Sequence, residues 1–427
     1  MLAGAAPPPS KAARTAASAR APAAAPALVP QVLLDGVGPL AWNAAVDRER
    51  GSGGTTPSWP AVRVLGPYGT ESLYVFPARA RAPTLVASWP RQEMAAHWVR
   101  MHPRYRWIVI ETPTDTASAS ARDAAMGAYT GSAYPRRVRF YSASGALQWE
   151  RTGSVPVALG RDLVLALSPS PADSTPPRLS VLRLPGGEAR ASWPGLAGWG
   201  ASSPLENFLA VNTIGVSDST TGPRQDELRL LDLEGKILWA RTVAADPREF
   251  AVSNFGDVAI ARERQLIVFD RSGAEKLRVM LPRNSVGRTA ITPDGRFALV
   301  ATSSPLPKHP GSGLWVALFE TTRKTPVWYR RNLPPEGAKL VDALELSLSD
   351  DGQRALVRLT SGAVLLLGGD GRRLASWNLE RASRGEYDPG YVPRRTWLSG
   401  DGATVAFTTP VARSLPEARG WLYRVPR

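Results

Sequence analysis

The sequence predicts an all-β chain built from repeated small antiparallel sheets, because one hairpin unit recurs along most of its length. The unit is an apolar strand, a tight turn with Gly, a second apolar strand and a Trp near the end. Six copies are recognisable, and they end at Trp89, Trp149, Trp193, Trp239, Trp328 and Trp377. Successive steps include 44 residues (149 to 193), 46 (193 to 239) and 49 (328 to 377). A period in the forties built from short strands is typical of a β-propeller.

One further copy of the unit lacks its Trp. The step from 239 to 328 is 89 residues, which is close to two periods. The segment QLIVFDRSGAEKLRVM lies in this interval and has Val279 where the Trp is expected. The series of hairpins is therefore continuous from about residue 90 to the end of the chain.

A second kind of hairpin alternates with the first. Its members have a polar turn between two strands: FAVSNFGDVAIA, TAITPDGRFALVAT, LELSLSDDGQRALVRL and TWLSGDGATVAFTT. Three of the turns contain Asp-Gly, at 294–295, 351–352 and 401–402, and Asp-Gly supplies the positive φ angles of tight hairpins. We predict that these hairpins are the inner A–B strand pairs and that the Trp-ending hairpins are the outer C–D pairs. The Asp side chains are expected to form turns rather than bind metal.

Each A–B pair with the C–D pair that follows makes a four-stranded sheet, one blade of a propeller. The predicted blades run over about 36–91, 92–151, 152–194, 195–242, 243–281, 282–330, 331–379 and 380–427. The last blade has only three strands, and the apolar segment 27–34 (ALVPQVLL) can supply a fourth beside residues 420–425. This N-terminal strand beside the C-terminal strand would close the ring without an exposed sheet edge. The prediction is eight blades, or seven if 36–91 packs differently, in one domain over 27–427.

Residues 1–26 are rich in Ala and Pro and have almost no large apolar side chains. Such a segment cannot bury enough surface to order itself, so we predict a disordered tail. Its opening LAGAA places Ala3 and Ala5 in the A-x-A relation seen at the end of signal peptides. One hypothesis is that the recorded start lies within a longer leader and that the mature protein is exported or periplasmic. Otherwise a cytoplasmic location is expected.

The chain is strongly basic, with a formal net charge of +15 and a pI of about 10.5. Only six of its 52 basic residues are Lys, and the basic residues are scattered, with no cluster of five or more. Because nucleic-acid surfaces concentrate basic residues in a patch or stripe, this spread argues against a nucleic-acid partner. A basic solvated surface is the main interpretation, and polyanion binding through the excess Arg is the weaker alternative.

The sequence has neither Cys nor a long apolar stretch, and this excludes several kinds of site and segment. The chain has no Cys, which excludes disulfides, thiolate metal sites and Cys nucleophiles. No stretch approaches the ~18 apolar residues of a membrane span, so no transmembrane segment is predicted.

The Trp-ending hairpins resemble the repeats of the pyrroloquinoline-quinone-enzyme superfamily, whose pattern is Asp, a short turn, Gly-Lys, then apolar residues and Trp. Asp232, Gly235, Lys236 and Trp239 match this pattern best, although Asp232 is one residue closer to Gly235 than in the family. The A–B hairpins resemble WD-repeat-like propeller repeats in their turns at 292–295 and 348–352. The resemblance covers about 90–427 and implies a propeller in which the Trp side chains dock between adjacent blades.

The longest insertions between predicted strands are mostly B–C connections: 112–137, 169–177, 216–226, 303–313 and 410–420. Long loops gathered on one face are the usual mark of a binding face in repeat proteins. We therefore expect a non-catalytic binding or scaffolding protein that uses this loop face for a protein or peptide partner. The candidate contact residues are Asp115, Arg122, Tyr129, Asp218, Arg224, Lys308, His309 and Arg413.

The alternative is a propeller enzyme, a hydrolase or lyase with its site at the central channel. Its candidate carboxylates are Asp342, Glu345 and Glu249. There is no G-x-S-x-G motif, and His97 and His102 have no evident third ligand, so no metal is expected. The quinone enzymes need cofactor ligands that include adjacent Cys residues, and this chain has none. No cofactor is therefore expected.

Overall fold

The structure is a computed structural model of the chain. It describes residues 30–37, 61–65, 70–75, 84–90, 94–102, 106–113, 137–141, 147–152, 155–159, 163–168, 178–183, 187–194, 196–205, 207–214, 225–244, 250–262, 264–281, 287–305, 312–331, 343–359, 363–378, 396–408 and 418–425. Side chains are described only within 178–425. The predicted tail over 1–26 lies outside these ranges.

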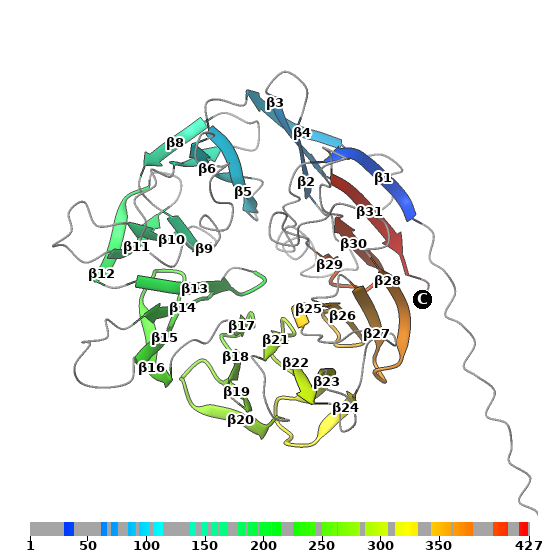
Figure 1. Cartoon of the computed structure of the whole chain (residues 1–427). Helices are drawn as coiled ribbons and strands as arrows, with labels where there is room; N and C mark the ends of the chain where they lie inside the picture. Colours follow the sequence, from blue (N-terminus) through cyan, green and yellow to red (C-terminus); the bar gives the residue numbers. More distant parts are fainter. Residues whose placement is uncertain are drawn as a thin grey trace, which may run out of the picture.

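The described strands form antiparallel sheets, nearly all of four strands, in which sequence neighbours pair (Figure 1). The first part of the chain contributes β2 (Ala61–Leu65), β3 (Thr70–Val75) and β4 (Thr84–Pro90); then β5 (Met94–His102), β6 (Arg106–Pro113), β7 (Arg137–Tyr141) and β8 (Leu147–Thr152); then β9 (Val155–Leu159), β10 (Leu163–Ser168), β11 (Arg178–Arg183) and β12 (Ala189–Pro194).

The middle sheets are β13 (Leu196–Ser202), β14 (Leu209–Ile214), β15 (Gln225–Leu231) and β16 (Ile237–Ala244); then β17 (Phe250–Val252), β18 (Val258–Arg262), β19 (Gln265–Phe269) and β20 (Glu275–Met280); then β21 (Arg288–Ile291), β22 (Phe297–Pro305), β23 (Ser312–Glu320) and β24 (Pro326–Arg330).

The last sheets are β25 (Ala343–Leu348), β26 (Arg354–Leu359), β27 (Ala363–Gly368) and β28 (Arg373–Asn378); then β29 (Thr396–Leu398), β30 (Thr404–Thr408) and β31 (Ala418–Arg424), which pairs with β1 (Pro30–Val37). In the β1–β31 pair, Leu33 lies opposite Trp421 and Leu34 opposite Gly420. Figure 1 shows the sheets arranged radially, with β17, β21, β25 and β29 toward the centre and β20, β24 and β28 outside.

Burial follows the position of each strand in its sheet. All six residues of β27 are buried, because a third strand is covered by neighbouring sheets on both faces. In the outer strand β20, buried Leu277 and Val279 alternate with exposed Arg278 and Met280. The outer strand therefore turns one face to the next sheet and the other outward, as the period of two requires.

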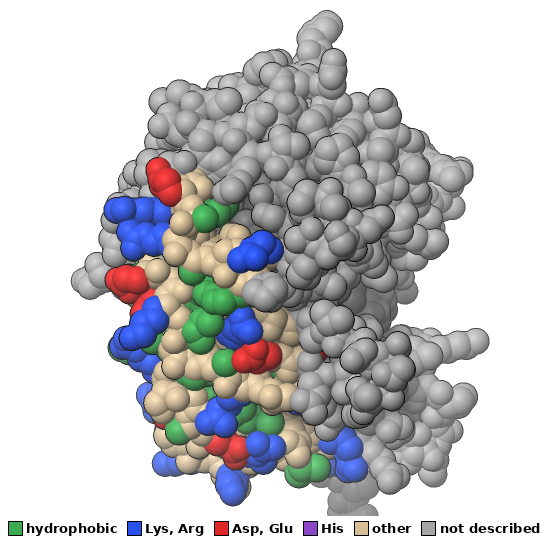
Figure 2. Space-filling view, turned by 90° about the vertical axis from the view of Figure 1, so that its left-hand side faces the viewer, with side chains coloured by type: hydrophobic (Ala, Val, Ile, Leu, Met, Phe, Trp, Pro, Cys, Tyr) green, Lys and Arg blue, Asp and Glu red, His purple; other side chains and the backbone are tan. Residues whose placement is uncertain are grey.

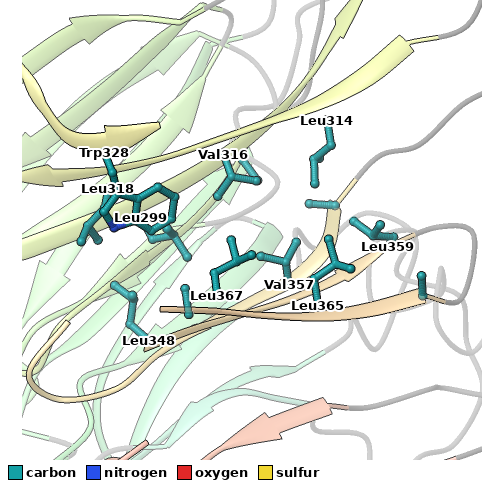
Figure 3. Packing of buried hydrophobic residues seen from close by; sticks show 14 residues of the cluster. Leu299, Leu314, Val316, Leu318, Trp328, Leu348, Val357, Leu359, Leu365 and Leu367 are labelled. Atoms are coloured by element: carbon teal, nitrogen blue, oxygen red, sulfur yellow. The ribbon is translucent and has the colours of Figure 1, made fainter. Parts of the chain in front are cut away.

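Successive sheets pack face to face, and their apolar side chains interlock. Leu299, Val316 and Leu318 of one sheet meet Val357, Leu365 and Leu367 of the next, and each is at most 2% exposed (Figure 3). Each sheet is too thin to bury both faces alone, so each core lies between two sheets.

The predicted all-β class and four-stranded antiparallel sheets are confirmed. The A–B hairpins form as predicted around 292–295, 349–352 and 399–402. The Trp-ending segments form the C–D pairs, and each pair has a register shift one residue pair away from its turn, as in β15–β16 at Leu230/Leu231. Among the described residues, the structure contains no helix long and apolar enough to cross a membrane.

Candidate binding surfaces

The connections between strands differ at the two ends of the sheets. From β5 onward, the first strand joins the second, and the third joins the fourth, through short turns. The long connections join second to third strands or one sheet to the next: 114–136, 169–177, 215–224, 331–342, 379–395 and 409–417. Because neighbouring strands are antiparallel, the strand ends that carry these connections lie on one side, which we call the connection-rich face. The opposite side is the turn face.

Six of the predicted loop-face residues belong to these connections, and Lys308 and His309 belong to the shorter connection 306–311 between β22 and β23. Asp115, Arg122, Tyr129, Asp218, Arg224, Lys308, His309 and Arg413 all lie outside the described residues. Their role in binding stays a prediction.

The turn face is built from one repeated hydrogen-bonded hairpin. In the turn after β25, Ser349 Oγ donates to Asp351 Oδ1 at 2.6 Å and accepts from the Arg354 N–H at 2.9 Å. Asp351 Oδ1 also accepts from the Gln353 N–H, and Gly352 follows with φ at +70°. The turns at 292–297 and 399–404 repeat this pattern. The carboxylates are thus occupied by their own turns, which is the turn-forming role predicted for them.

Neighbouring turns on this face are also joined to one another. The Asn254 N–H donates to the Pro293 carbonyl at 2.8 Å, and the Asp350 N–H donates to the Gly400 carbonyl at 2.7 Å. Arg354 adds a side-chain hydrogen bond of 2.8 Å to the Gly402 carbonyl of the next sheet. The turn face is therefore cross-linked from sheet to sheet.

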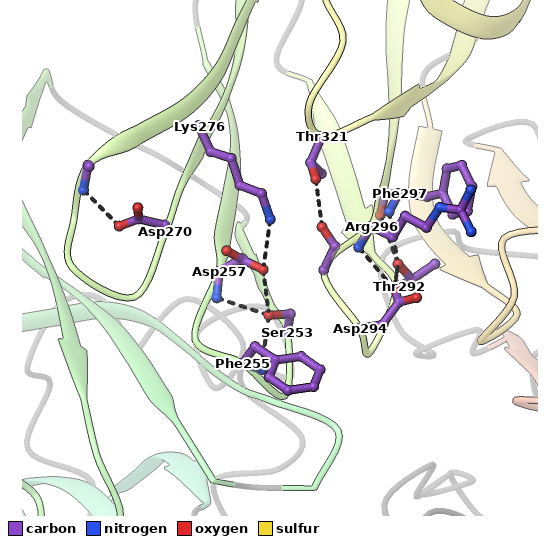
Figure 4. A network of polar contacts seen from close by, with 12 residues as sticks. Ser253, Phe255, Asp257, Asp270, Lys276, Thr292, Asp294, Arg296, Phe297 and Thr321 are labelled. Atoms are coloured by element: carbon purple, nitrogen blue, oxygen red, sulfur yellow. Dashed lines mark hydrogen bonds and ion pairs between the residues drawn. The ribbon is translucent and has the colours of Figure 1, made fainter.

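The turn at 253–257 departs from the pattern. Phe255 takes the place of the Asp and is 63% exposed, and Asp257 follows the Gly and is only 6% exposed. Asp257 accepts from Ser253 Oγ at 3.3 Å and pairs with Lys276 Nζ at 3.3 Å (Figure 4). Burial raises the pKa of the Asp257 carboxyl, and this effect outweighs the opposing Lys276 ammonium.

Asp257 and Asp270 are expected to give opposite pH dependences of stability. Asp257 keeps its proton to a higher pH when folded, so its contribution to stability falls as the pH rises from the ordinary value of 3.8 through its raised pKa. The hydrogen bond from Ser272 lowers the pKa of Asp270, so Asp270 adds stability above 3.8 that is lost as the pH falls through its lowered pKa. Urea unfolding of wild type, Asp257→Asn and Asp270→Asn across acidic pH measures both.

The slope against pH is the readout, because each substitution also removes hydrogen bonds. Relative to Asp257→Asn, the wild type should lose stability as the pH rises. Relative to Asp270→Asn, it should gain stability over the same scan. Slopes of the same sign for both pairs would contradict the assignment.

The Trp residues of the C–D hairpins occupy two register positions. Trp149, Trp239 and Trp328 lie next to the shifted pair beside the turn, opposite Phe140, Leu230 and Leu318. Trp193 and Trp377 lie two residues further along, opposite Leu179 and Val364. Both positions are on the same face of the strand, because side chains two residues apart share a face.

The Trp side chains that the structure describes contact the following sheet. Trp239 lies with its ring 5.7 Å from the ring of Phe269, and a Cβ placed on Gly273 would be 2.9 Å from Trp239 Cγ. Trp328 lies over Gly371 in the same way, at 2.6 Å from such a Cβ. Trp377 packs on Tyr423 at 5.2 Å, and Trp193 lies beneath Arg229 at 6.0 Å. The side chains of Trp89 and Trp149 are outside the described part.

The junction after β20 departs from this series. Leu277 and Val279 occupy the two Trp register positions, opposite Val268 and Leu266. The turn that faces them, between β23 and β24, has Thr321, Thr322, Arg323 and Lys324 and no Gly. The indole and the turn Gly are thus both missing at this junction.

A groove of about 620 Å³ opens at this junction, and we call it the β20–β24 groove. Its described lining is aromatic and apolar with a basic margin: Arg278, Val279, Met280, Leu281, Trp315, Phe319, Lys324, Pro326, Tyr329 and Arg331. On the other side of β20, a more polar groove of about 690 Å³ is lined by Arg241, Arg262 and Arg278 together with Glu275 and Gln265. On the face shown in Figure 2, the described basic side chains lie among acidic and apolar ones.

Of the carboxylates considered for a channel enzyme, the structure describes Glu345. Its Oε2 accepts from the N–H and Oγ1 of Thr396, both at 3.1 Å, and pairs with Arg358 Nε at 3.1 Å. Glu345 thus links β25 to β29 of the next sheet. Asp342 and Glu249 lie outside the described residues, and the described residues contain no group of His, Asp and Glu that could hold a metal ion.

Comparison with known structures agrees with this architecture. BamB from Moraxella catarrhalis is similar with a TM-score of 0.50 and 12% identity, over 93% of this chain and 100% of that one. The C-terminal WD40 domain of Sif2 is similar with a TM-score of 0.54 and 12% identity, over 94% of this chain and 99% of that one. No family model matches the sequence, and no curated protein matches it. The chain is a β-propeller repeat protein, and the predicted resemblance to quinone-enzyme-like and WD-type propellers is confirmed at the level of the fold.

Proposed function

We propose that this chain is a protein-binding scaffold: an eight-bladed propeller over 27–427, closed by β1 beside β31, that binds a protein or peptide through its connection-rich face. The observation that carries the proposal is the unequal distribution of connections. The long segments leave from one side of the sheets, and the turn face has short hairpins whose polar groups bond to one another. A fixed frame that presents variable segments on one side is the usual arrangement of a binding surface.

The residues proposed to contact the partner are those predicted from the sequence, from Asp115 to Arg413. They combine basic, acidic and aromatic side chains, as protein-interaction surfaces do. The Trp residues from Trp89 to Trp377 are proposed to have a structural role at the junctions between blades. The contacts of Trp239 and Trp328 with the following sheet support that role.

Shortening the connections tests the binding proposal. Segments 114–136 and 215–224 are replaced by short Gly/Ser turns in the full chain, and partners are captured by affinity and quantified by mass spectrometry. The expected result is loss of a defined set of partners, with far-ultraviolet circular dichroism unchanged.

The matched control alters the turn face. Phe255→Ala with Arg296→Ala changes two exposed side chains there and should leave the same partners bound. A partner profile that survives the shortened connections, or that is lost only in the turn-face control, would reject the proposed binding face.

A further inference from the structure

The β20–β24 groove lies where the inter-sheet packing series is interrupted. At the preceding junction, Trp239 covers Phe269 and Gly273 of the next sheet. The equivalent receiving residue after β20 is Phe319, which lies beside the turn of its own hairpin just as Phe269 does. The strand facing it offers Leu277 instead of an indole. Phe319 therefore has no indole from the preceding sheet, and its described aromatic neighbour is Trp315 of its own strand, with the ring centroids 6.5 Å apart.

We propose that the β20–β24 groove binds an acidic peptide segment of a partner protein, with one aromatic side chain of that segment entering the groove. The floor is apolar: Val279, Leu281, Trp315 and Phe319 are each less than 9% exposed. At the margin, Met280 is 62% exposed and Tyr329 is 49% exposed, so both offer apolar surface to an incoming ring. The volume of about 620 Å³ lies within the range of ligand sites.

The charge of the margin indicates an acidic partner. Arg278, Lys324 and Arg331 line the groove, and no acidic residue is among its described lining residues. Glu275 pairs with Arg278 at 2.5 Å and also interacts electrostatically with Lys324, but no acidic side chain of the described residues forms an ion pair with Lys324 or Arg331. The neighbouring groove across β20 is lined by Arg241 and Arg262 beside the single acidic residue Glu275, so a segment that crosses β20 meets a basic excess on both sides. Such complementarity steers association and excludes basic partners.

The occupant is expected to come from another chain. The N-terminal segment 1–26 carries Lys11, Arg14 and Arg20, and it has no acidic and no aromatic residue. Its positive charge would be repelled by the basic margin, and it has no aromatic side chain to enter the groove. This inference concerns the outer rim of the sheets and is independent of the connection-rich face.

The test uses the full chain and a fluorescein-labelled short peptide of Asp and Glu with one central Trp. Binding is followed by fluorescence anisotropy. Met280→Ala with Tyr329→Ala should weaken binding about tenfold, because both side chains are exposed in the free protein and would contact the ring. Leu233→Ala with Phe255→Ala removes exposed apolar side chains from turns that do not line the groove and should leave the affinity unchanged.

A second pair of variants isolates charge. Lys324→Glu with Arg331→Glu should also weaken binding about tenfold at low salt. Arg372→Glu with Arg373→Glu makes the same change in net charge on exposed residues at the turn before β28 and in β28, and should have little effect. Both pairs alter exposed side chains, so the fold should be retained.

Several outcomes would overturn the inference. One is equal affinity for a peptide in which Ala replaces the central Trp, which would mean that the groove does not bind the aromatic ring. Another is equal loss of binding in both charge-reversed pairs, or full displacement by a heparin fragment, since either would indicate general polyanion binding. Unchanged affinity of the Met280/Tyr329 variant would place the peptide elsewhere. Because the variant with shortened connections keeps this groove, it should still bind the peptide whether or not the proposed scaffold function holds.

Discussion

Replacing Trp239 by Ala is expected to lower the free energy of unfolding by about 3–5 kcal/mol. Trp239 is 8% exposed and packs on Phe269 and Gly273 of the following sheet, so its removal leaves a cavity between two sheets. The stability of a repeat array depends on the interfaces between neighbours, and this substitution weakens one of them directly. Equilibrium urea denaturation followed by far-ultraviolet circular dichroism measures the change.

Phe255→Ala is the control for the loss of an aromatic side chain. Phe255 is 63% exposed on the turn face, so its removal should change the free energy of unfolding by less than about 0.5 kcal/mol. Equal effects of the two substitutions would show that Trp239 contributes no packing between the sheets.

Replacing Gly371 by Ala is expected to cost about 2–5 kcal/mol, which combines backbone strain with overpacking. The φ of Gly371 is +75°, where a Cβ is disfavoured, and that Cβ would lie 2.6 Å from Trp328 Cε3. Gly368→Ala is the control at the same hairpin, because Gly368 has no positive φ and a Cβ there would lie no closer than 3.3 Å to a neighbour. Its effect should stay within about 1 kcal/mol.

A double-mutant cycle separates the two causes at Gly371. In a Trp328→Ala background the steric part is removed, so Gly371→Ala should cost only the strain of about 1–2 kcal/mol. The four proteins are compared by the same urea denaturation. An equal cost of Gly371→Ala in both backgrounds would show that the indole does not press on this turn.

The hairpins could be predicted from the sequence because their signals are local. Asp294-Gly295 and Asp351-Gly352 are turn dipeptides between apolar strands, and the structure has the predicted turns there. The same holds for the C–D turn at Asp232 and Gly235, where the Gly N–H bonds to the Asp carbonyl. These turns depend only on residues a few positions apart.

The two register positions of the Trp residues could not be predicted in the same way. Trp239 follows its turn Gly by four residues and Trp377 follows Gly371 by six, and both spacings put the side chain on the same face. The register shift beside each turn decides which partner lies opposite, and nothing in the spacing reveals it. For the same reason the sequence pointed to Val279 alone, although Leu277 occupies the register position of Trp239.

Of the two candidate binding surfaces, one could be predicted from local features of the sequence and the other could not. Long insertions can be recognised by counting residues between strands, so the connection-rich face was predictable. The β20–β24 groove was not, because it depends on what the following sheet contributes, namely Phe319 and a turn without Gly. Contacts between residues of different hairpins cannot be inferred from the order of residues within one hairpin.

The seating of an indole on the next hairpin's Gly also constrains how such a chain can evolve. A copied or exchanged repeat brings its own Trp but meets whichever turn already follows it, and the structure shows such turns with Gly273 or Gly371 and one without any Gly. Transplanting the Trp239 hairpin to the position before the Thr321–Lys324 turn would place its ring beside a turn that has no Gly for it to pack on. The Trp of one repeat and the turn of the next repeat must therefore change together. The part that is constrained as a unit is the junction between two repeats, rather than the single repeat that is visible in the sequence.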